Sequence, residues 1–216
     1  MNIFPLNMLR RLQNLKVLQI RNCNSVEEVF GVRGVNDDEI HDMVSTQLRV
    51  LRLLNLPKLK HVWTSDLQAI IKFQNLCVVE VSKCKSLKSL FPVSVAQNFE
   101  QLETLYIYDS GLEEIVAMDE GLETTTKFVF PRVTSLNLES LPELNCFYPG
   151  KHTSEWPLLK WLTIHKCGKM KTVASNLLSF PDTNVLGHHV SVQLPFVMTE
   201  KVWTHTCFFV SVIIIK

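Results

Sequence analysis

The sequence of 216 residues lacks the short motifs that identify several large classes of protein. It contains no G-x-x-x-x-G-K-[S/T] phosphate-binding loop, no G-x-S-x-G nucleophile motif and no H-E-x-x-H zinc motif. No asparagine stands in an N-x-[S/T] glycosylation sequon. We therefore expect a protein that is not an enzyme and that has no cofactor.

An excess of charge and a long apolar run are missing as well. Lysine and arginine number 22 and aspartate and glutamate 21, so no overall field favours nucleic acid or an anionic membrane as a partner. The most apolar stretch, residues 208–215, is far shorter than the roughly 20 residues of a membrane-spanning helix. The first residues lack the apolar core and cleavage site of a signal peptide. These features predict a cytoplasmic protein.

The six cysteines do not form a C-x-x-C pair. Three of them occupy one position of an otherwise apolar pattern, which predicts small buried side chains rather than disulfides. Carboxylates cluster in residues 31–47 and 117–127, but without the spacing of a calcium-binding loop. We expect no bound metal.

What the sequence does contain is a repeated apolar pattern, L-x-x-L-x-L followed by further apolar residues at three-residue spacing. Six copies begin at Leu15, Leu48, Leu76, Leu102, Val133 and Leu159. The position three residues after each L-x-L core is Cys23, Cys84 and Cys167 in copies one, three and six, and Leu-Pro in copies two and five. Copy four has Ser110 there and is one residue short afterwards.

Spacings of this length and a pattern of this type are typical of leucine-rich repeats, which fold only when stacked. The L-x-L core predicts a short strand whose apolar side chains point inward and whose intervening residues point out. The predicted fold is thus of the α/β class: a curved leucine-rich-repeat solenoid with a concave parallel sheet of about six short strands. Its convex side is expected to be mostly irregular or 3₁₀. Residues 1–175 form the predicted repeat domain and residues 176–216 a non-repeat tail, with a truncated further repeat as an alternative.

The outward residues of these strands form the candidate binding surface. They vary in size, charge and hydrogen-bonding capacity, whereas the inward residues are uniformly apolar. Tyr106, Tyr108 and Trp161 are the expected anchors, because aromatic residues supply much of the energy at protein interfaces. The other candidates are Gln19, Arg21, Arg52, Glu80, Asn137, Glu139, Thr163 and His165. Arg52 and Glu80 are expected to pair with each other.

Phrases such as VLQIRNCNSVEEVF, LRLLNLPKLKHVW and SLFPVSVAQNFEQLETLYIYDSGLEEIV resemble the C-terminal repeats of plant nucleotide-binding leucine-rich-repeat disease-resistance proteins. The coiled-coil class of that family fits best, and the resemblance covers roughly residues 12–175. It implies an intracellular immune receptor in which this region recognises a pathogen effector or a host protein, or contacts other domains of the receptor. The sequence lacks the phosphate-binding loop of such receptors and is expected to be a fragment.

Three alternatives remain open. An extracellular receptor-like repeat protein would normally have a signal peptide and sequons. A substrate-recognition subunit of a ubiquitin ligase would bring an adaptor-binding motif outside the repeats. The third alternative is a truncated product without function.

Overall fold

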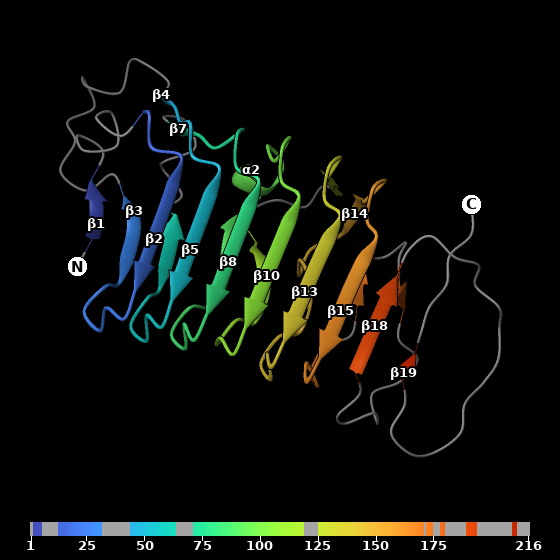
Figure 1. Cartoon of the computed structure of the whole chain (residues 1–216). Coiled ribbons are helices and arrows are strands. Elements are labelled where there is room, and N and C mark those ends of the chain that lie inside the picture. Colours follow the sequence, from blue (N-terminus) through green and yellow to red (C-terminus); the bar gives the residue numbers. More distant parts are fainter. Residues whose placement is uncertain are drawn as a thin grey trace.

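The computed structural model describes residues 2–5, 13–31, 44–63, 71–118, 125–170, 172–174, 178–179, 189–193 and 209–210. Within these residues the chain forms a parallel β-solenoid. Each repeat supplies one strand to a long main sheet, and the chain then passes behind that sheet before the next strand begins (Figure 1).

The main sheet has eight strands in the order β19-β18-β15-β13-β10-β8-β5-β2. The six strands of the predicted repeats are all parallel to one another. They are β2 (Val17–Arg21), β5 (Val50–Leu54), β8 (Val78–Ser82), β10 (Thr104–Tyr108), β13 (Ser135–Glu139) and β15 (Trp161–His165). The prediction of six short parallel strands is therefore confirmed.

Alternation along these strands positions the core. In β5, for example, Leu51 and Leu53 are completely buried, whereas the residues between and beside them are partly exposed. The register runs without a shift from Leu18 through Leu105 to Leu162, so equivalent side chains of successive repeats stack on one another. Full burial of each aliphatic side chain contributes about 1.5–3 kcal/mol, and these stacked rows hold the repeats together.

The residue that follows each of these six strands has a positive φ, between 49° and 56°. These residues are Asn22, Asn55, Lys83, Asp109, Ser140 and Lys166. In the first five, the backbone N–H still donates to the last strand residue of the next repeat, as from Lys83 to the Tyr108 carbonyl at 3.1 Å. The chain must leave the sheet at once after that bond, and the left-handed conformation makes this abrupt turn.

The return side is mostly irregular, as predicted, but it differs from the prediction in two details. It contains short parallel strands, of which β3 pairs with β6 and β9 with β11, and no 3₁₀ helix occurs in the described residues. These strands are β3 (Glu28–Gly31), β6 (His61–Trp63), β9 (Ser89–Pro92) and β11 (Glu114–Ala117). The in-register main sheet brings equivalent return segments close together, so their backbone groups bond between repeats instead of within one.

Helix is scarce in the described part of the chain, although the α/β class was expected. The α-helix there is α2 (Val93–Ala96), a single turn whose Val93, Val95 and Ala96 are buried. The segments that would supply helices in an α/β repeat form the short return strands instead. The described residues are accordingly a parallel β-solenoid with little helix.

Further short strands complete the described backbone. All pair in parallel except β16 with β17 and β18 with β15, which are antiparallel. They are β1 (Asn2–Pro5), β4 (Val44–Ser45), β7 (Ile71–Lys72), β12 (Thr126–Val129), β14 (His152–Glu155), β16 (Thr172–Ala174), β17 (Leu178–Ser179), β18 (His189–Gln193) and β19 (Phe209–Val210). The domain boundary at residue 175 stays a prediction.

Aromatic rings fill the space between the main sheet and the return side. Trp63 contacts Phe30 at a ring-centroid distance of 6.1 Å and Phe91 at 5.1 Å, and so links three successive repeats. Farther along, Phe130 stacks on Trp156 at 4.0 Å. Such pairs contribute about 0.5–1.5 kcal/mol beyond the burial of their area.

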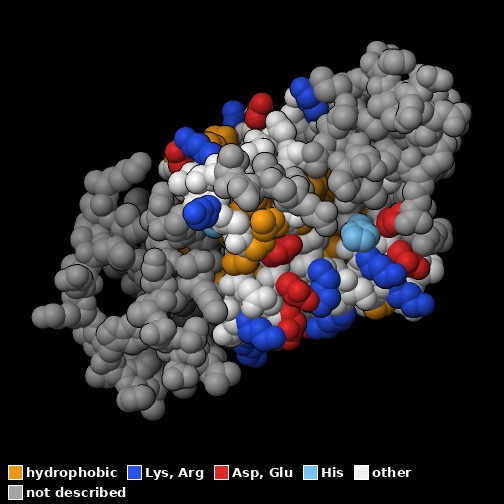
Figure 2. Space-filling model, turned by 180° about the vertical axis from the view of Figure 1, so that it is seen from behind, with side chains coloured by type: hydrophobic (Ala, Val, Ile, Leu, Met, Phe, Trp, Pro, Cys, Tyr) orange, Lys and Arg blue, Asp and Glu red, His pale blue; other side chains and the backbone are white. Residues whose placement is uncertain are grey.

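Ion pairs connect neighbouring repeats at the surface. Glu27 pairs with Lys60 at 3.1 Å and Lys88 with Glu113 at 2.5 Å, and Glu143 pairs with Lys169 at 2.6 Å. Figure 2, which views the molecule from behind, shows acidic and basic side chains side by side along the lower part of that face. All these groups are substantially exposed, so each pair contributes little to stability.

Candidate protein-interaction face

The outward residues of β2, β5, β8, β10, β13 and β15 form one surface, which we call the open face. Strand register aligns them in three rows that cross the strands. The middle row is Gln19, Arg52, Glu80, Tyr106, Asn137 and Thr163, and the third row is Arg21, Leu54, Ser82, Tyr108, Glu139 and His165. The first row is Val17, Val50, Val78, Thr104, Ser135 and Trp161.

All eleven candidate residues of the sequence lie on this face, and none of them is buried. Gln19, Arg21 and Trp161 are exposed, and the others are partly exposed because neighbouring strands flank them. Trp161 retains 47% of its surface and Val17 51%, at opposite ends of the first row. The structure thus brings the candidates together, and whether they bind a partner stays a prediction.

The expected pair between Arg52 and Glu80 is present. The Arg52 Nε donates to Glu80 Oε2 at 2.9 Å across the β5–β8 junction. The two side chains remain 40% and 31% exposed, so the pair contributes little to stability. It does neutralise both charges locally, and this part of the open face offers a partner no net charge.

The tyrosines of β10 lie between carboxylates. Tyr106 stands opposite Glu80 on one side and Asn137 on the other, while Tyr108 stands opposite Ser82 and Glu139. Partial burial raises the pKa of the Tyr106 hydroxyl, and the nearby charges of Glu139 and Glu80 raise it further. This part of the face therefore has aromatic surface beside the Glu139 carboxylate, while Glu80 is paired with Arg52.

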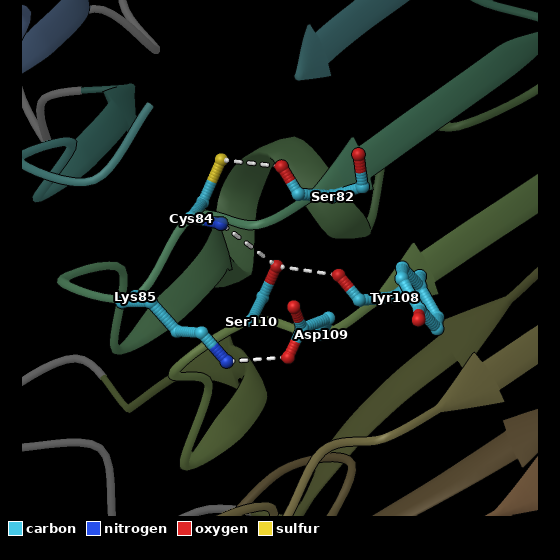
Figure 3. A network of polar contacts seen from close by, with 6 residues as sticks. All are labelled: Ser82, Cys84, Lys85, Tyr108, Asp109 and Ser110. Carbon is cyan, nitrogen blue, oxygen red and sulfur yellow. Dashed lines mark hydrogen bonds and ion pairs between the residues drawn. The ribbon is translucent and has the colours of Figure 1, made fainter. Parts of the chain in front are cut away.

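A polar network fixes the turns at the end of β8 and β10 (Figure 3). Ser110 Oγ accepts a hydrogen bond from the Cys84 backbone N–H at 3.2 Å and donates to the Tyr108 carbonyl at 3.0 Å. The Cys84 thiol donates to the Ser82 carbonyl at 3.4 Å, and the Lys85 ammonium pairs with Asp109. The network holds the ends of both strands, and with them Tyr108, in a fixed position.

The cysteines at the fourth repeat position are buried or partly buried free thiols, as the sequence predicts. Cys84 also lies 3.6 Å from the Leu53 carbonyl, and Cys167 lies 3.5 Å from the Leu138 carbonyl, each in the preceding repeat. Burial raises the pKa of both thiols to about 11. These thiols link repeats through weak hydrogen bonds and remain protonated at neutral pH.

Sequence reasoning missed the role of Gly111 beside this network. A Cβ added at Gly111 would lie 2.0 Å from the Lys85 carbonyl oxygen, so no larger residue fits without a backbone shift. The shortening of repeat four after Ser110 was the visible signal in the sequence that this turn differs from the others.

The described residues show neither a metal-binding cluster nor a membrane-spanning helix. Their His, Cys, Asp and Glu side chains form no group of three or more that could hold a metal ion. No helix among them is long and apolar enough to cross a membrane. The acidic clusters around Asp38 and Glu120 lie outside the described residues.

A comparison with protein-family models gives one match. Residues 1–111 match the family described as plant disease resistance protein RPS2-like, leucine-rich repeats. No curated protein and no solved structure matches the chain. The matched part runs from β1 through β10 and the turn at Ser110, and so includes four of the six repeat strands. The chain therefore belongs to the RPS2-like leucine-rich-repeat family of plant disease resistance proteins.

Proposed function

We propose that this chain is the protein-recognition module of an intracellular plant immune receptor and acts in defence against pathogens. Its partner on the open face is a protein: a pathogen effector, a host protein that the effector modifies, or another domain of the receptor. The module is not an enzyme and binds no cofactor, nucleic acid or membrane.

The observation that carries this proposal is the contrast between the two sides of one strand. In β10 the inward residues Leu105 and Ile107 are buried aliphatics, like their equivalents in all six repeats. The outward residues Thr104, Tyr106 and Tyr108 differ from their neighbours in every row. Core packing therefore restricts the inward positions to aliphatic residues, while the residue types at the outward positions can be selected for contact with a partner.

The size and rigidity of the open face also suit a protein partner. Six strands spaced about 4.8 Å apart form a surface roughly 24 Å across, which matches one side of a standard protein interface. In the proposed receptor this sheet is the concave side of a curved α/β repeat array. The free thiols of Cys23, Cys77 and Cys84 support a reducing, cytoplasmic location.

The proposal is tested by capture from plant cell extract on the immobilised full chain, with bound proteins identified by mass spectrometry. The test variant combines Tyr106→Ala, Tyr108→Ala and Trp161→Ala. The control is Leu158→Ala, because Leu158 is as exposed as Trp161, at 50% against 47%, but lies in the turn before β15.

We expect proteins captured by the unmodified chain and by the Leu158→Ala variant to be lost from the triple variant. Anchors of this kind contribute more than about 1 kcal/mol each, so three changes together reduce affinity at least about a hundredfold. Capture of the same proteins by the triple variant, with its fold intact by circular dichroism, would show that the open face is not the binding surface.

A further inference from the structure

Glu139 is one of the two acidic residues of the open face. It lies at the end of β13, partly exposed, and no lysine or arginine of the described residues pairs with its carboxylate. Glu80, the other acidic residue of the face, is already bonded to Arg52. A half-buried carboxylate without a lysine or arginine counterion is an incomplete ion pair that a partner can supply.

The two arginines of the open face are too far away to compensate Glu139, and its basic neighbour there is His165, its register partner on β15. Arg21 lies on β2, four strands from β13, which corresponds to roughly 19 Å at 4.8 Å per strand. Arg52 is three strands away and occupied by Glu80. Salt screens charges over about 8 Å under physiological conditions, so neither arginine reduces the field at Glu139.

Two tyrosine rings border the same carboxylate. Tyr108 is the register partner of Glu139 in the adjacent strand, and Tyr106 is its diagonal neighbour on the same face. Both positions are within reach of long side chains in a sheet. The influence of Glu139 on the Tyr106 hydroxyl, whose pKa it raises, agrees with that proximity.

We propose that the protein partner of the open face places an arginine side chain against Tyr106 and Tyr108, with its guanidinium paired to Glu139. This inference rests on the proposed function and names the chemistry of the partner at that site. A carboxylate beside aromatic faces suits a guanidinium because the group is planar, stacks on rings and donates two parallel hydrogen bonds to a carboxylate. A lysine ammonium offers neither the stacking nor the bidentate geometry.

The neighbouring groups favour the same occupant. Asn137, the register partner of Tyr106 on β13, donates its side-chain amide to Ser135 Oγ at 2.9 Å, which leaves its carbonyl oxygen for further N–H donors. This part of the face therefore presents two oxygen acceptors, the Glu139 carboxylate and the Asn137 carbonyl, beside the tyrosine rings. An acidic segment of a partner would be repelled here.

The inference is tested with a random-peptide library selected against the immobilised full chain. The best binder is then made as a synthetic peptide in three forms: with arginine, with lysine and with citrulline, which keeps the planar shape but not the charge. Affinities are measured for the unmodified chain, for Glu139→Gln and for Glu143→Gln. Glu143→Gln is the matched control, because it removes one carboxylate from the same repeat, but in the turn, where Glu143 pairs with Lys169.

We expect the selected peptides to share an arginine. Replacement of that arginine by citrulline and the Glu139→Gln change should each weaken binding about tenfold, as loss of a hydrogen bond between charged groups does. The two changes combined should weaken it no more than either alone, because they remove the same contact. The lysine peptide should bind more weakly than the arginine peptide, and Glu143→Gln should leave all affinities unchanged.

The possible failures are distinct. Peptides that lose binding in the Trp161→Ala variant but not in Glu139→Gln overturn the arginine inference and leave the proposed function intact. Peptides that are insensitive to every open-face substitution, or the absence of any selected binder, count against both proposals. Circular dichroism and urea unfolding of the Glu139→Gln chain establish that its fold is unchanged.

Discussion

Substitution of Gly111 by alanine tests how closely repeats three and four are packed. The new Cβ would lie 2.0 Å from the Lys85 carbonyl oxygen and 2.8 Å from its carbon. An ordinary carbon–oxygen contact is about 3.3 Å, so one backbone must move by more than about 1 Å. The movement also strains the hydrogen bond from the Gly111 N–H to the Cys84 carbonyl, which is 3.1 Å long.

The cost follows from these two effects. Overpacking of this kind costs about 1–3 kcal/mol and a weakened backbone hydrogen bond about 1 kcal/mol. The smaller conformational freedom of alanine in the unfolded chain returns about 0.4–1 kcal/mol. We expect Gly111→Ala to lower the free energy of unfolding by about 2–3 kcal/mol, and to lower the Tm by roughly 4–12 °C.

Gly168→Ala is the matched control. Gly168 follows Cys167 as Gly111 follows Ser110, but a Cβ there meets no atom within 4 Å, and its φ lies outside the left-handed range. This variant should be unchanged or more stable by about 0.4–1 kcal/mol. Urea unfolding followed by circular dichroism measures both. Equal stability of the two variants would refute the close packing of the shortened turn on Lys85.

Four further predictions follow from the same geometry. Leu105→Ala should cost about 2–5 kcal/mol in urea unfolding, whereas Tyr106→Ala on the other side of the strand should cost far less; equal losses would contradict the alternation. Lys83→Asn should stabilise the chain by about 0.5–1 kcal/mol, because asparagine tolerates the φ of 54° better than lysine; a loss of stability would argue against that backbone conformation. The Cys84 pKa of about 11 lies above the value of 9.0 for a free thiol, so at pH 9 about 1% of the folded thiol is ionised, against about half of the unfolded thiol. Cys84 should therefore react slowly with iodoacetamide until the chain is unfolded, and equal rates would show an accessible thiol. Calorimetric titration of the full chain with calcium, zinc and ATP should show no binding, and micromolar affinity for any of them would overturn that expectation.

The Cys84 shift also fixes the sign of a pH effect on stability. Burial raises the pKa of the Cys84 thiol, so the folded chain favours the protonated thiol more than the unfolded chain does. The contribution of Cys84 to the free energy of unfolding is therefore complete below the unfolded pKa of about 9. That contribution is lost as the pH rises toward 11. Cys167, whose pKa is also about 11, adds in the same direction.

The open face was predictable from the sequence because it depends on a period of two and on repeat alignment alone. Tyr106 and Glu80 had to become neighbours once their repeats stacked in register, and the Arg52–Glu80 pair followed from the same alignment. The absence of a lysine or arginine partner for Glu139 among the described residues was not predictable. It depends on which cations reach its carboxylate in space, and Lys169, a cation of the adjacent repeat, pairs with Glu143 instead.

The sequence by itself determined the main sheet of this protein, because the L-x-L cores specify which side chains are buried. The hydrophobic effect is non-directional, so this burial does not depend on the exact geometry of the rest of the chain. Only the tertiary structure decided the return side, where β9 and β11 pair although the three-residue apolar spacing predicts a 3₁₀ or irregular path. Backbone hydrogen bonds there form between repeats that are distant in sequence, and no local pattern records them. The same holds for Gly111, which must be glycine because the Lys85 carbonyl of the preceding repeat occupies the space of a Cβ.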